Sequence, residues 1–328
     1  MDRQHICGQR GIRLKSAEID EAPGPYAMSF GFDLHPLCES IRNIGLLNPP
    51  CIGMGEKGEI EVITGYRRLL ALKKLGWPEV TCEDLSFVLP SPRERLLFAF
   101  YENLASRVFN PVEKAMILRR LEPLLDKEDI LKRMMPLLFL PAHEGTFRFY
   151  AELAEMNHAF KDAVACGRIS LNTAKSLMDL EPESAESAFQ CIINLTLNFN
   201  QQAQFIDIIN DLLVLEGKLY SQILEAEPMA AIFENKHLNK PQKAKKLLEE
   251  LRSRRYPRWM AAARRFQENI ARLSLPEGAR IDHPAYFEAP GYRLEVQFQD
   301  GVDLMKKLRR LSQWSGLGEF RDPLDEHD

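Results

Sequence analysis

The sequence contains no long hydrophobic run. Its longest apolar stretch, near residues 134–140, is too short to cross a bilayer and is interrupted by Pro136. The first residues, MDRQHICGQRGIRLK, lack the apolar core of a signal peptide. These absences predict a cytoplasmic protein without a membrane partner.

Cysteine is scarce, and no two cysteines form a CxxC pair. This spacing argues against a structural zinc site and against a disulfide framework. Isolated cysteines usually serve as small buried hydrophobic residues. The chain has six of them: Cys7, Cys38, Cys51, Cys82, Cys166 and Cys191.

The chain as a whole lacks a positive excess, because 43 Lys and Arg residues face 47 Asp and Glu residues, a net charge of −4. Residues 236–272 are the exception, with twelve Lys or Arg residues against three Glu residues. Such a basic block predicts contacts with nucleic-acid phosphates, and a solvated helical face is the alternative. The residues of the block that we expect to contact DNA are Lys245, Lys246, Arg252, Arg254, Arg255 and Arg258.

The length of 328 residues predicts two or three domains. After an irregular lead-in over residues 1–30, short helices and strands alternate through the first hundred residues. This pattern predicts a compact α/β unit. Its expected elements are a helix over 34–44, strands over 50–53 and 60–64, a helix directly after Gly65 and a strand over 79–83.

Helical patterns replace the strands from about residue 91. Asn110, Pro111 and Glu113 together form a strong helix-start signal. Helices are expected as far as about residue 272, with a break at Pro257. Two alternating segments and an amphipathic helix close the chain, over 279–288, 292–300 and 302–314. The fold class predicted is therefore a multidomain α+β protein.

The segment Thr64–Arg68 is a first candidate site, because it lies where a strand turns into a helix. A helix N-terminus offers unpaired N–H groups and a partial positive charge, which attract anions. Gly65 lets the backbone approach a ligand, and Arg67 and Arg68 can contact phosphate oxygens in pairs. The alternative is a turn glycine followed by two solvated arginines.

A second candidate site follows some forty residues downstream, at Glu102, Asn103 and Arg107. Carboxylate and amide oxygens are ligands that magnesium prefers, and an arginine can balance phosphate charge. A surface ion pair on a helix is the alternative interpretation.

In their order and spacing, three stretches resemble the ParB family of partition proteins: SIRNIGLLNPP, ITGYRRLLALKKLGW and ENLASRVFNPVEKA. The stretch FKDAVACGRISLNTAKSLMDLEP is similar to the family segment that follows its helix-turn-helix. The closing strand–strand–helix pattern is similar to the family's dimerisation domain.

The resemblance implies a specific domain order and activity. A flexible segment (1–30) would precede a ParB-like nucleotide-binding domain (31–108), an all-helical helix-turn-helix domain (109–235), a basic helical linker (236–272) and a β-β-α dimerisation domain (273–328). Family members are homodimers that bind CTP with Mg²⁺, load at a centromere-like DNA site, close around DNA and partner a ParA-type ATPase. The resemblance thus implies specific and nonspecific contacts to double-stranded DNA, and association with the nucleoid.

Individual residues receive roles from the same resemblance. Gly65, Arg67 and Arg68 would cradle phosphates. Glu102 and Asn103 would serve the magnesium ion and the hydrolytic water, which makes Glu102 the candidate catalytic residue. Arg107 would contact the distal phosphate.

The chain departs from the family in three places. Tyr66 stands where the family usually has Glu, and a phenol neither polarises water nor supports a metal well at neutral pH, so weak CTP hydrolysis is the most we expect. The family's ParA-contacting stretch is not recognisable in residues 1–25. The expected recognition helix, EGTFRFYAELAEM, offers few groups to DNA beyond Thr146 and Arg148.

The leading hypothesis is a CTP- and magnesium-gated DNA clamp in chromosome or plasmid partition. A ParB-like DNA-binding regulator or adaptor with weak or no nucleotide hydrolysis is the alternative that Tyr66 favours. A nuclease is a third hypothesis. It would need clustered carboxylates or histidines for two metal ions, and Glu102 stands alone in the candidate site.

Overall fold

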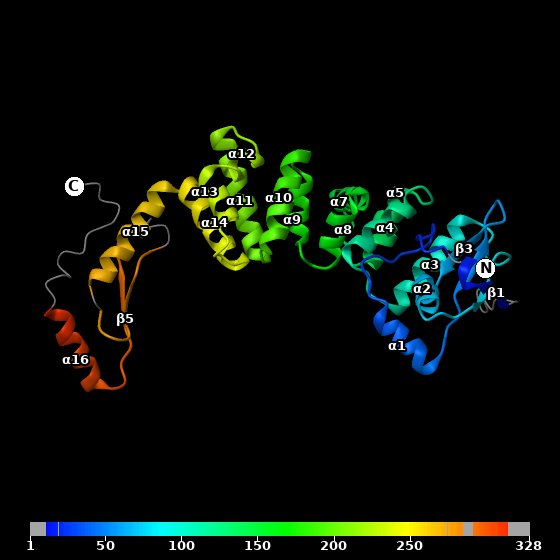
Figure 1. Cartoon of the computed structure of the whole chain (residues 1–328), viewed down its shortest axis with the longest axis horizontal. Helices are drawn as coiled ribbons and strands as arrows, with labels where there is room; N and C mark the ends of the chain where they lie inside the picture. Colours follow the sequence, from blue (N-terminus) through cyan, green and yellow to red (C-terminus); the bar gives the residue numbers. More distant parts are fainter. Residues whose placement is uncertain (1–10, 19, 274, 285–290, 314–328) are drawn as a thin grey trace. The chain divides into compact units, whose positions relative to one another are not determined.

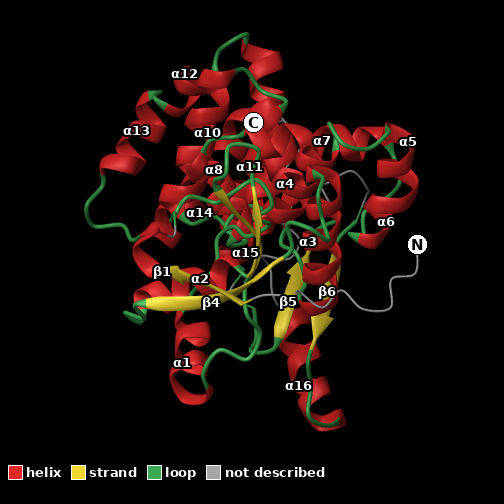
Figure 2. Ribbon diagram, turned by 90° about the vertical axis from the view of Figure 1, so that its right-hand side faces the viewer, coloured by secondary structure: helices red, strands yellow, loops and turns green. Residues whose placement is uncertain are grey.

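The computed structural model describes residues 11–18, 20–273, 275–284 and 291–313 of the chain. Its contacts divide the chain into two compact units, Met1–Lys175 and Ser176–Asp328. Helices make up most of both units, and the strands occupy the N-terminal and C-terminal parts of the sequence (Figures 1 and 2).

A four-stranded sheet forms the base of the first unit, in the order β1-β4-β2-β3. Its central contact is parallel, between β2 and β4, and the two outer contacts, β1 with β4 and β2 with β3, are antiparallel. The strands are β1 (Gly11–Lys15), β2 (Cys51–Met54), β3 (Ile60–Thr64) and β4 (Glu79–Asp84). The strands predicted over 50–53, 60–64 and 79–83 are therefore confirmed to within one residue.

Helices α1 (His35–Ile44) and α2 (Tyr66–Lys74) pack their apolar faces together with this sheet. The core they share includes Ile52, Leu69, Leu72 and Val80, all nearly inaccessible to solvent. Helix α3 (Pro92–Ser106) begins at a capping box in which Ser91 and Glu94 exchange hydrogen bonds. Because α2 starts directly at the end of β3, its first turn lies at an edge of the packed sheet.

The predicted irregular lead-in is wrong for residues 11–18, whereas residues 20–30 contain only turns and bends. Strand β1 pairs along its whole length with β4, and it is followed by the short 3-10 helix η1 (Ser16–Glu18). Tyr26, Ala27 and Met28 are also buried. The missed signal is the alternation in GIRLK, which places Ile12 and Leu14 on one face of a strand. Residues 1–10 lie outside the described residues.

Helices complete the first unit. Helix α4 starts at the predicted capping box of Asn110 and Glu113, which the structure confirms. It packs against α7 and α8. The elements are α4 (Pro111–Leu121), α5 (Lys127–Asp129), the π-helical η2 (Ile130–Met134), α6 (Met135–Leu137), α7 (Glu144–Glu155), α8 (His158–Ala165) and α9 (Leu171–Met178), the last of which runs across the unit boundary.

The second unit opens with a bundle of helices. These are α10 (Pro182–Leu195), α11 (Phe199–Glu216), α12 (Tyr220–Leu224), α13 (Glu227–Glu234), α14 (Lys240–Arg255) and α15 (Pro257–Arg272). The helical break predicted at Pro257 is confirmed. Helix α14 buries Ala244, Leu247, Leu248 and Leu251 and packs on α10, α11 and α13. This part of the predicted linker is therefore a core element of the bundle.

The C-terminal part of the second unit has the predicted strand–strand–helix order. Strands β5 (Ala279–Asp282) and β6 (Arg293–Val296) pair antiparallel, and helix α16 (Gly301–Ser312) follows. Both strands are shorter than the sequence predicted, and residues 285–290 and 314–328 lie outside the described residues.

Four of the cysteines are buried as expected, and Cys166 is exposed. Burial raises the pKa of the Cys82 thiol to about 11. Cys7 lies outside the described residues. None of the described helices combines the length and the apolar character that a bilayer crossing requires.

Candidate functional site

The backbone turn at Gly65 packs closely against Pro50. Its φ angle is +85°, and a Cβ atom at this position would lie 2.8 Å from the Cα atom of Pro50. Only glycine fits such a position without strain. Gly65 is also the N-cap of α2 and gives the first turn no side-chain hydrogen bond. The first amides of α2 are therefore left for another acceptor, as in anion sites at helix N-termini.

A pocket of about 410 Å³ opens beside this turn, within the range of ligand sites. Its walls include Gly65, Arg67 and Arg68 on one side and Glu102, Asn103 and Arg107 on the other. The Nη2 atom of Arg68 lies 3.1 Å from Oε1 of Glu102. The two candidate segments, separated by about forty residues in sequence, thus line one pocket and are joined by the ion pair between Arg68 and Glu102.

Arg68 and Arg67 are anchored at different places on the pocket wall. Nη1 of Arg68 donates to the carbonyl oxygen of Asn48 at 2.8 Å. Nε of Arg67 donates to the Ser29 hydroxyl at 3.0 Å, and its guanidinium lies 4.6 Å from the ring centre of Phe32. Burial, and then the nearby charge of Arg107, lowers the pKa of Arg67.

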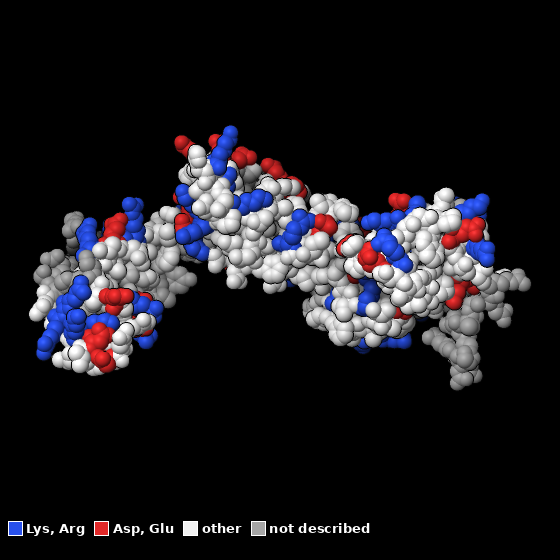
Figure 3. Space-filling model, turned by 60° about the horizontal axis from the view of Figure 1, so that its bottom comes forward, with Lys and Arg blue, Asp and Glu red and all other residues white. Residues whose placement is uncertain are grey.

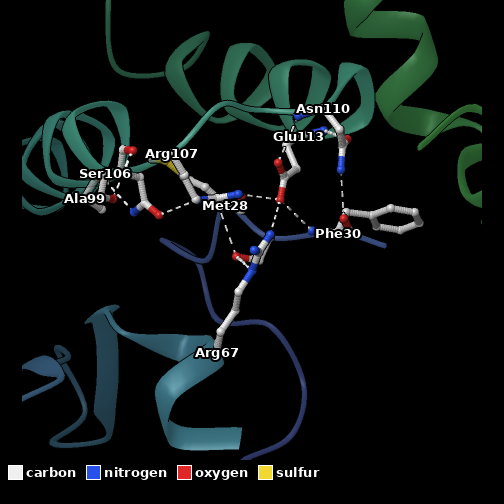
Figure 4. Close-up of polar contacts among 10 residues, drawn as sticks. Met28, Phe30, Arg67, Ala99, Ser106, Arg107, Asn110 and Glu113 are labelled. Carbon is white, nitrogen blue, oxygen red and sulfur yellow. Dashed lines mark hydrogen bonds and ion pairs between the residues drawn. The ribbon is translucent and has the colours of Figure 1, made fainter. Parts of the chain in front are cut away.

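Glu113 is a member of this site that the sequence identified only as a helix-capping residue. Its side chain is 2% exposed, and Oε1 accepts hydrogen bonds from both Arg67 and Arg107 (Figure 4). The backbone N–H of Phe30 donates to the same oxygen at 3.1 Å. Glu113 therefore joins α2, the end of α3, the start of α4 and the segment before α1.

Asn103 and Arg107 bond mainly to the protein itself. Nε of Arg107 donates to Oδ1 of Asn103 at 2.9 Å, and its other nitrogens donate to Glu113, to the Met28 carbonyl and to the Ser29 hydroxyl (Figure 4). The amide nitrogen of Asn103 donates to the carbonyl oxygen of Ala99 at 2.8 Å. In this arrangement Arg107 holds Met28 and Ser29, which line the pocket, and Asn103 holds Arg107.

Tyr66 is anchored through its hydroxyl group to the segment before α1. The hydroxyl donates to the carbonyl oxygen of Glu21 at 2.5 Å, and the ring meets the edge of Phe32 at a centroid distance of 6.2 Å. Burial raises the pKa of this phenol, so it stays protonated at neutral pH. Tyr66 thereby fastens residues 21–32 to α2 and places no carboxylate in the pocket.

The pocket fits a hydrated magnesium ion that is held mainly by phosphate oxygens. Such ions need only one or two protein carboxylates, and Glu102 lines the cavity with a side chain that is 36% exposed. The Thr64 hydroxyl, also on the wall, is buried and has no hydrogen-bond partner in the described part of the chain. Across residues 11–18, 20–273, 275–284 and 291–313, no three His, Cys, Asp or Glu side chains cluster as a metal site.

Helix α7 carries the two residues predicted to read DNA. Arg148 is exposed, Thr146 is half-buried, and Phe147 between them is buried in the core. The other charges on exposed positions of α7 are negative, and they include Glu144 and Glu155. This surface offers DNA little positive charge.

The basic block is partly neutralised by α11. Arg254 forms a two-bond ion pair with Glu216, and Nε of Arg255 lies 2.9 Å from Oδ2 of Asp211. Arg252 donates to Gln204. The three remaining candidates, Lys245, Lys246 and Arg258, are exposed. On the face drawn in Figure 3, basic and acidic side chains are interspersed.

The fold and the pocket define a multidomain α+β protein with a pocket at the start of a helix, followed by helical segments. No family model matches the chain. The nucleoid occlusion protein of Geobacillus thermodenitrificans is 27% identical over 176 residues, which cover 52% of this chain and 59% of that protein. The probable chromosome-partitioning protein ParB of Campylobacter jejuni is 27% identical over 201 residues, which cover 59% of this chain and 68% of that protein. Over rather more than half of its length, the chain is thus similar to nucleoid occlusion proteins and to chromosome-partitioning ParB proteins.

These alignments reach only part of each relative, and the first of them spans less than two thirds of the relative's length. Among solved structures, the C-terminally truncated chromosome-partitioning protein ParB of Caulobacter crescentus in complex with CTP-γ-S matches 56% of this chain and 99% of that one. The sequence identity is 18%, and the TM-score is 0.26.

Proposed function

We propose that this protein is a CTP- and magnesium-gated DNA clamp of the partition type, acting on chromosome or plasmid DNA. The observation that carries the proposal is the single pocket shared by the Gly65 turn and Glu102. It combines an uncapped helix start, convergent arginines and a carboxylate, the groups that a triphosphate with magnesium requires.

Each group has a distinct task in this proposal. The first amides of α2 bind phosphate oxygens, since Gly65 leaves room for them. Arg68 and Arg67 neutralise phosphate charge, and Glu102 supports the magnesium ion. When bound, the metal neutralises phosphate charge and orients the phosphates. Arg107 acts by holding Met28 and Ser29 in place, and Asn103 acts by holding Arg107, so a direct role for either in binding metal or phosphate requires that these bonds open.

Hydrolysis is slow in this proposal because position 66, beside the arginines, holds a phenol in place of a carboxylate; of the carboxylates nearby, Glu113 is engaged by Arg67 and Arg107, and Asp33 accepts the backbone N–H of His35. Tyr66 occupies the position that the resemblance assigns to Glu, and its protonated hydroxyl is bound to Glu21. A phenol held in this way cannot act as a general base at neutral pH. Glu102, which lines the pocket and contacts Arg68, is then our candidate for orienting water.

The wider proposal assigns the other partners. A homodimer forms through the β5-β6-α16 region, and DNA is contacted by α7 through Thr146 and Arg148. Lys245, Lys246 and Arg258 add nonspecific phosphate contacts. The protein partner is a ParA-type ATPase, and the protein associates with the nucleoid in the cytoplasm.

Calorimetric titration tests the nucleotide site directly. CTP, ATP and GTP with magnesium are titrated into the wild type, into Arg68→Ala and into the control Arg42→Ala, which removes an exposed arginine of α1. We expect CTP to bind selectively, with binding lost in Arg68→Ala and kept in Arg42→Ala. Absence of binding at millimolar nucleotide, or equal binding by both variants, refutes the nucleotide site.

A DNA-binding regulator or adaptor is the second candidate function. The position of Tyr66 favours it, because this residue fastens residues 21–32 and contributes nothing to hydrolysis. In this case DNA binding persists without any dependence on CTP. Electrophoretic mobility shifts with and without CTP distinguish the two candidates.

A further inference from the structure

One oxygen atom of Glu113 accepts three hydrogen bonds. Oε1 accepts from Nη2 of Arg67 at 2.7 Å, from Nη1 of Arg107 at 2.6 Å and from the Phe30 amide at 3.1 Å (Figure 4). Both guanidinium groups also line the pocket, whereas Glu113 lies behind them. A single buried carboxylate therefore holds the same two arginines that an anion entering the pocket would meet.

The cluster of Arg67, Arg107 and Glu113 carries more positive than negative charge. Two guanidinium groups converge on one carboxylate, and their mutual repulsion contributes to the lowered pKa of Arg67. Two cations that converge in this way attract an anion, and in the free protein the Glu113 carboxylate takes that place. A phosphate group brings more charge and more acceptor oxygens than this one carboxylate.

We infer that Glu113 competes with the phosphate of a bound ligand for Arg67 and Arg107, and thereby sets the affinity of the pocket for triphosphate. This inference rests on the proposed function. In the free protein Glu113 neutralises and holds the arginines. On binding, hydrogen bonds of the arginines pass from its carboxylate to phosphate oxygens, and breaking the internal ion pairs weakens the net affinity.

The surroundings of Glu113 make this exchange feasible. Its Oε2 atom accepts from the Asn110 amide at 3.0 Å, and Oε1 keeps the Phe30 amide when the arginines turn away. The carboxylate also lies at the start of α4, where the helix dipole favours negative charge. A buried carboxylate with two amide donors and a helix N-terminus remains stabilised without the guanidinium groups.

Replacing Glu113 by Gln removes the negative charge and keeps a side chain that can cap α4. Gln serves at the third helical position of a capping box as Glu does, so α4 keeps its start signal. A matched control exists in the same unit, because Glu94 holds the same position in the capping box of α3 without contacting an arginine. Glu94→Gln thus repeats the chemical change away from the pocket.

The probes are inorganic triphosphate and CTP, each with magnesium, titrated by calorimetry. We expect Glu113→Gln to bind both probes about tenfold more tightly than the wild type, a difference of about 1.4 kcal/mol. Glu113→Asp, which keeps the charge but shortens its reach, should give a smaller gain. Glu94→Gln should leave the affinity unchanged.

Thermal melting supplies a second readout. Without ligand, Glu113→Gln should melt below the wild type, because two buried guanidinium groups lose their counter-charge. With triphosphate, its melting temperature should rise further than that of the wild type. A carboxylate that only supported the fold would lower stability without enlarging the ligand-induced rise.

The outcomes separate the inference from the proposed function. Equal or weaker binding by Glu113→Gln, beside measurable binding by the wild type, overturns the inference alone. If Glu113→Gln does not fold, weaker or unchanged binding by Glu113→Asp overturns it in the same way. Absence of binding by the wild type and by every variant overturns the inference and the proposed function together.

Discussion

The ion pair between Arg254 and Glu216 offers a direct test of how the basic block is used. Arg254, near the end of α14, donates two hydrogen bonds to the carboxylate of Glu216, the last residue of α11. The two side chains are 23% and 21% exposed. Replacement of Arg254 by Glu removes both bonds and sets two carboxylates against each other. The double variant Arg254→Glu with Glu216→Arg restores the pair with its polarity reversed.

The expected energies are modest because water still reaches the pair. Exposed ion pairs contribute about 0.2–1 kcal/mol, and two-bond arginine–carboxylate geometry lies at the upper end of that range. We therefore expect Arg254→Glu to destabilise the contact between α11 and α14 by about 1–2 kcal/mol, since repulsion adds to the lost attraction. The double variant should recover about 1 kcal/mol of this loss.

Hydrogen exchange of peptides from α11 and α14 measures the opening of this contact without requiring global unfolding. The same variants are then assayed for the salt dependence of nonspecific DNA affinity. If Arg254 serves mainly to hold α14 on α11, the double variant exchanges like the wild type and keeps its salt slope. A restored exchange rate with a slope reduced by about one unit would refute this reasoning and show that Arg254 contacts a DNA phosphate.

The pH dependence of the same contact has a definite sign. The hydrogen bonds from Arg254 lower the pKa of Glu216 below its ordinary value. The stabilisation is therefore fully present above the unfolded glutamate pKa of about 4.3, and it is lost as pH falls through the lowered folded value. Arg254→Ala should flatten this acid-side loss, and an unchanged profile would contradict the assignment.

Three further predictions concern single features. Gly65→Ala should destabilise the first unit by about 1–2 kcal/mol in thermal melting, because its Cβ would meet Pro50 and its φ angle is left-handed. The same variant should lose triphosphate binding in calorimetry. Tyr66→Glu should raise the rate of CTP hydrolysis, measured by phosphate release, whereas Tyr66→Phe should leave that rate unchanged. Reversal of charge at Lys245 and Lys246 should reduce the salt slope of DNA binding by about one unit per lost phosphate contact, and an unchanged slope would make them solvated surface.

Much of the first unit could be predicted from local pattern. The strand over 60–64 and the capping box at Asn110 follow from alternation and from helix-start residues, which are properties of a few neighbouring positions. Strand β1 was missed because the glycine- and proline-rich residues after it suggested an irregular segment. Its pairing with β4 bridges more than sixty residues of sequence, and local pattern does not reveal such a partner.

The candidate site was predictable in its location but not in its bonding. The Gly65 turn and Glu102 carry recognisable chemistry, and the structure places them around one cavity. The partners of Arg107 could not be foreseen, since Met28 and Ser29 lie almost eighty residues away in sequence. Glu113 was seen as a capping residue because that role is local, while its bond to Arg67 depends on tertiary packing.

The same physical reason explains why the ion pairs of the arginines were not predicted, both in the pocket and in the basic block. A sequence window counts charges along the chain, but the field that a ligand meets depends on which charges are already paired in space. In the pocket, Glu113 from α4 engages two arginines, and in the basic block, Asp211 and Glu216 from α11 engage two more. None of these carboxylates lies in the segment whose positive charge it reduces. Arginine-rich segments of this protein should therefore respond to loss of a distant carboxylate as strongly as to loss of an arginine. The single variants Glu113→Gln and Glu216→Gln test this expectation in the two units independently.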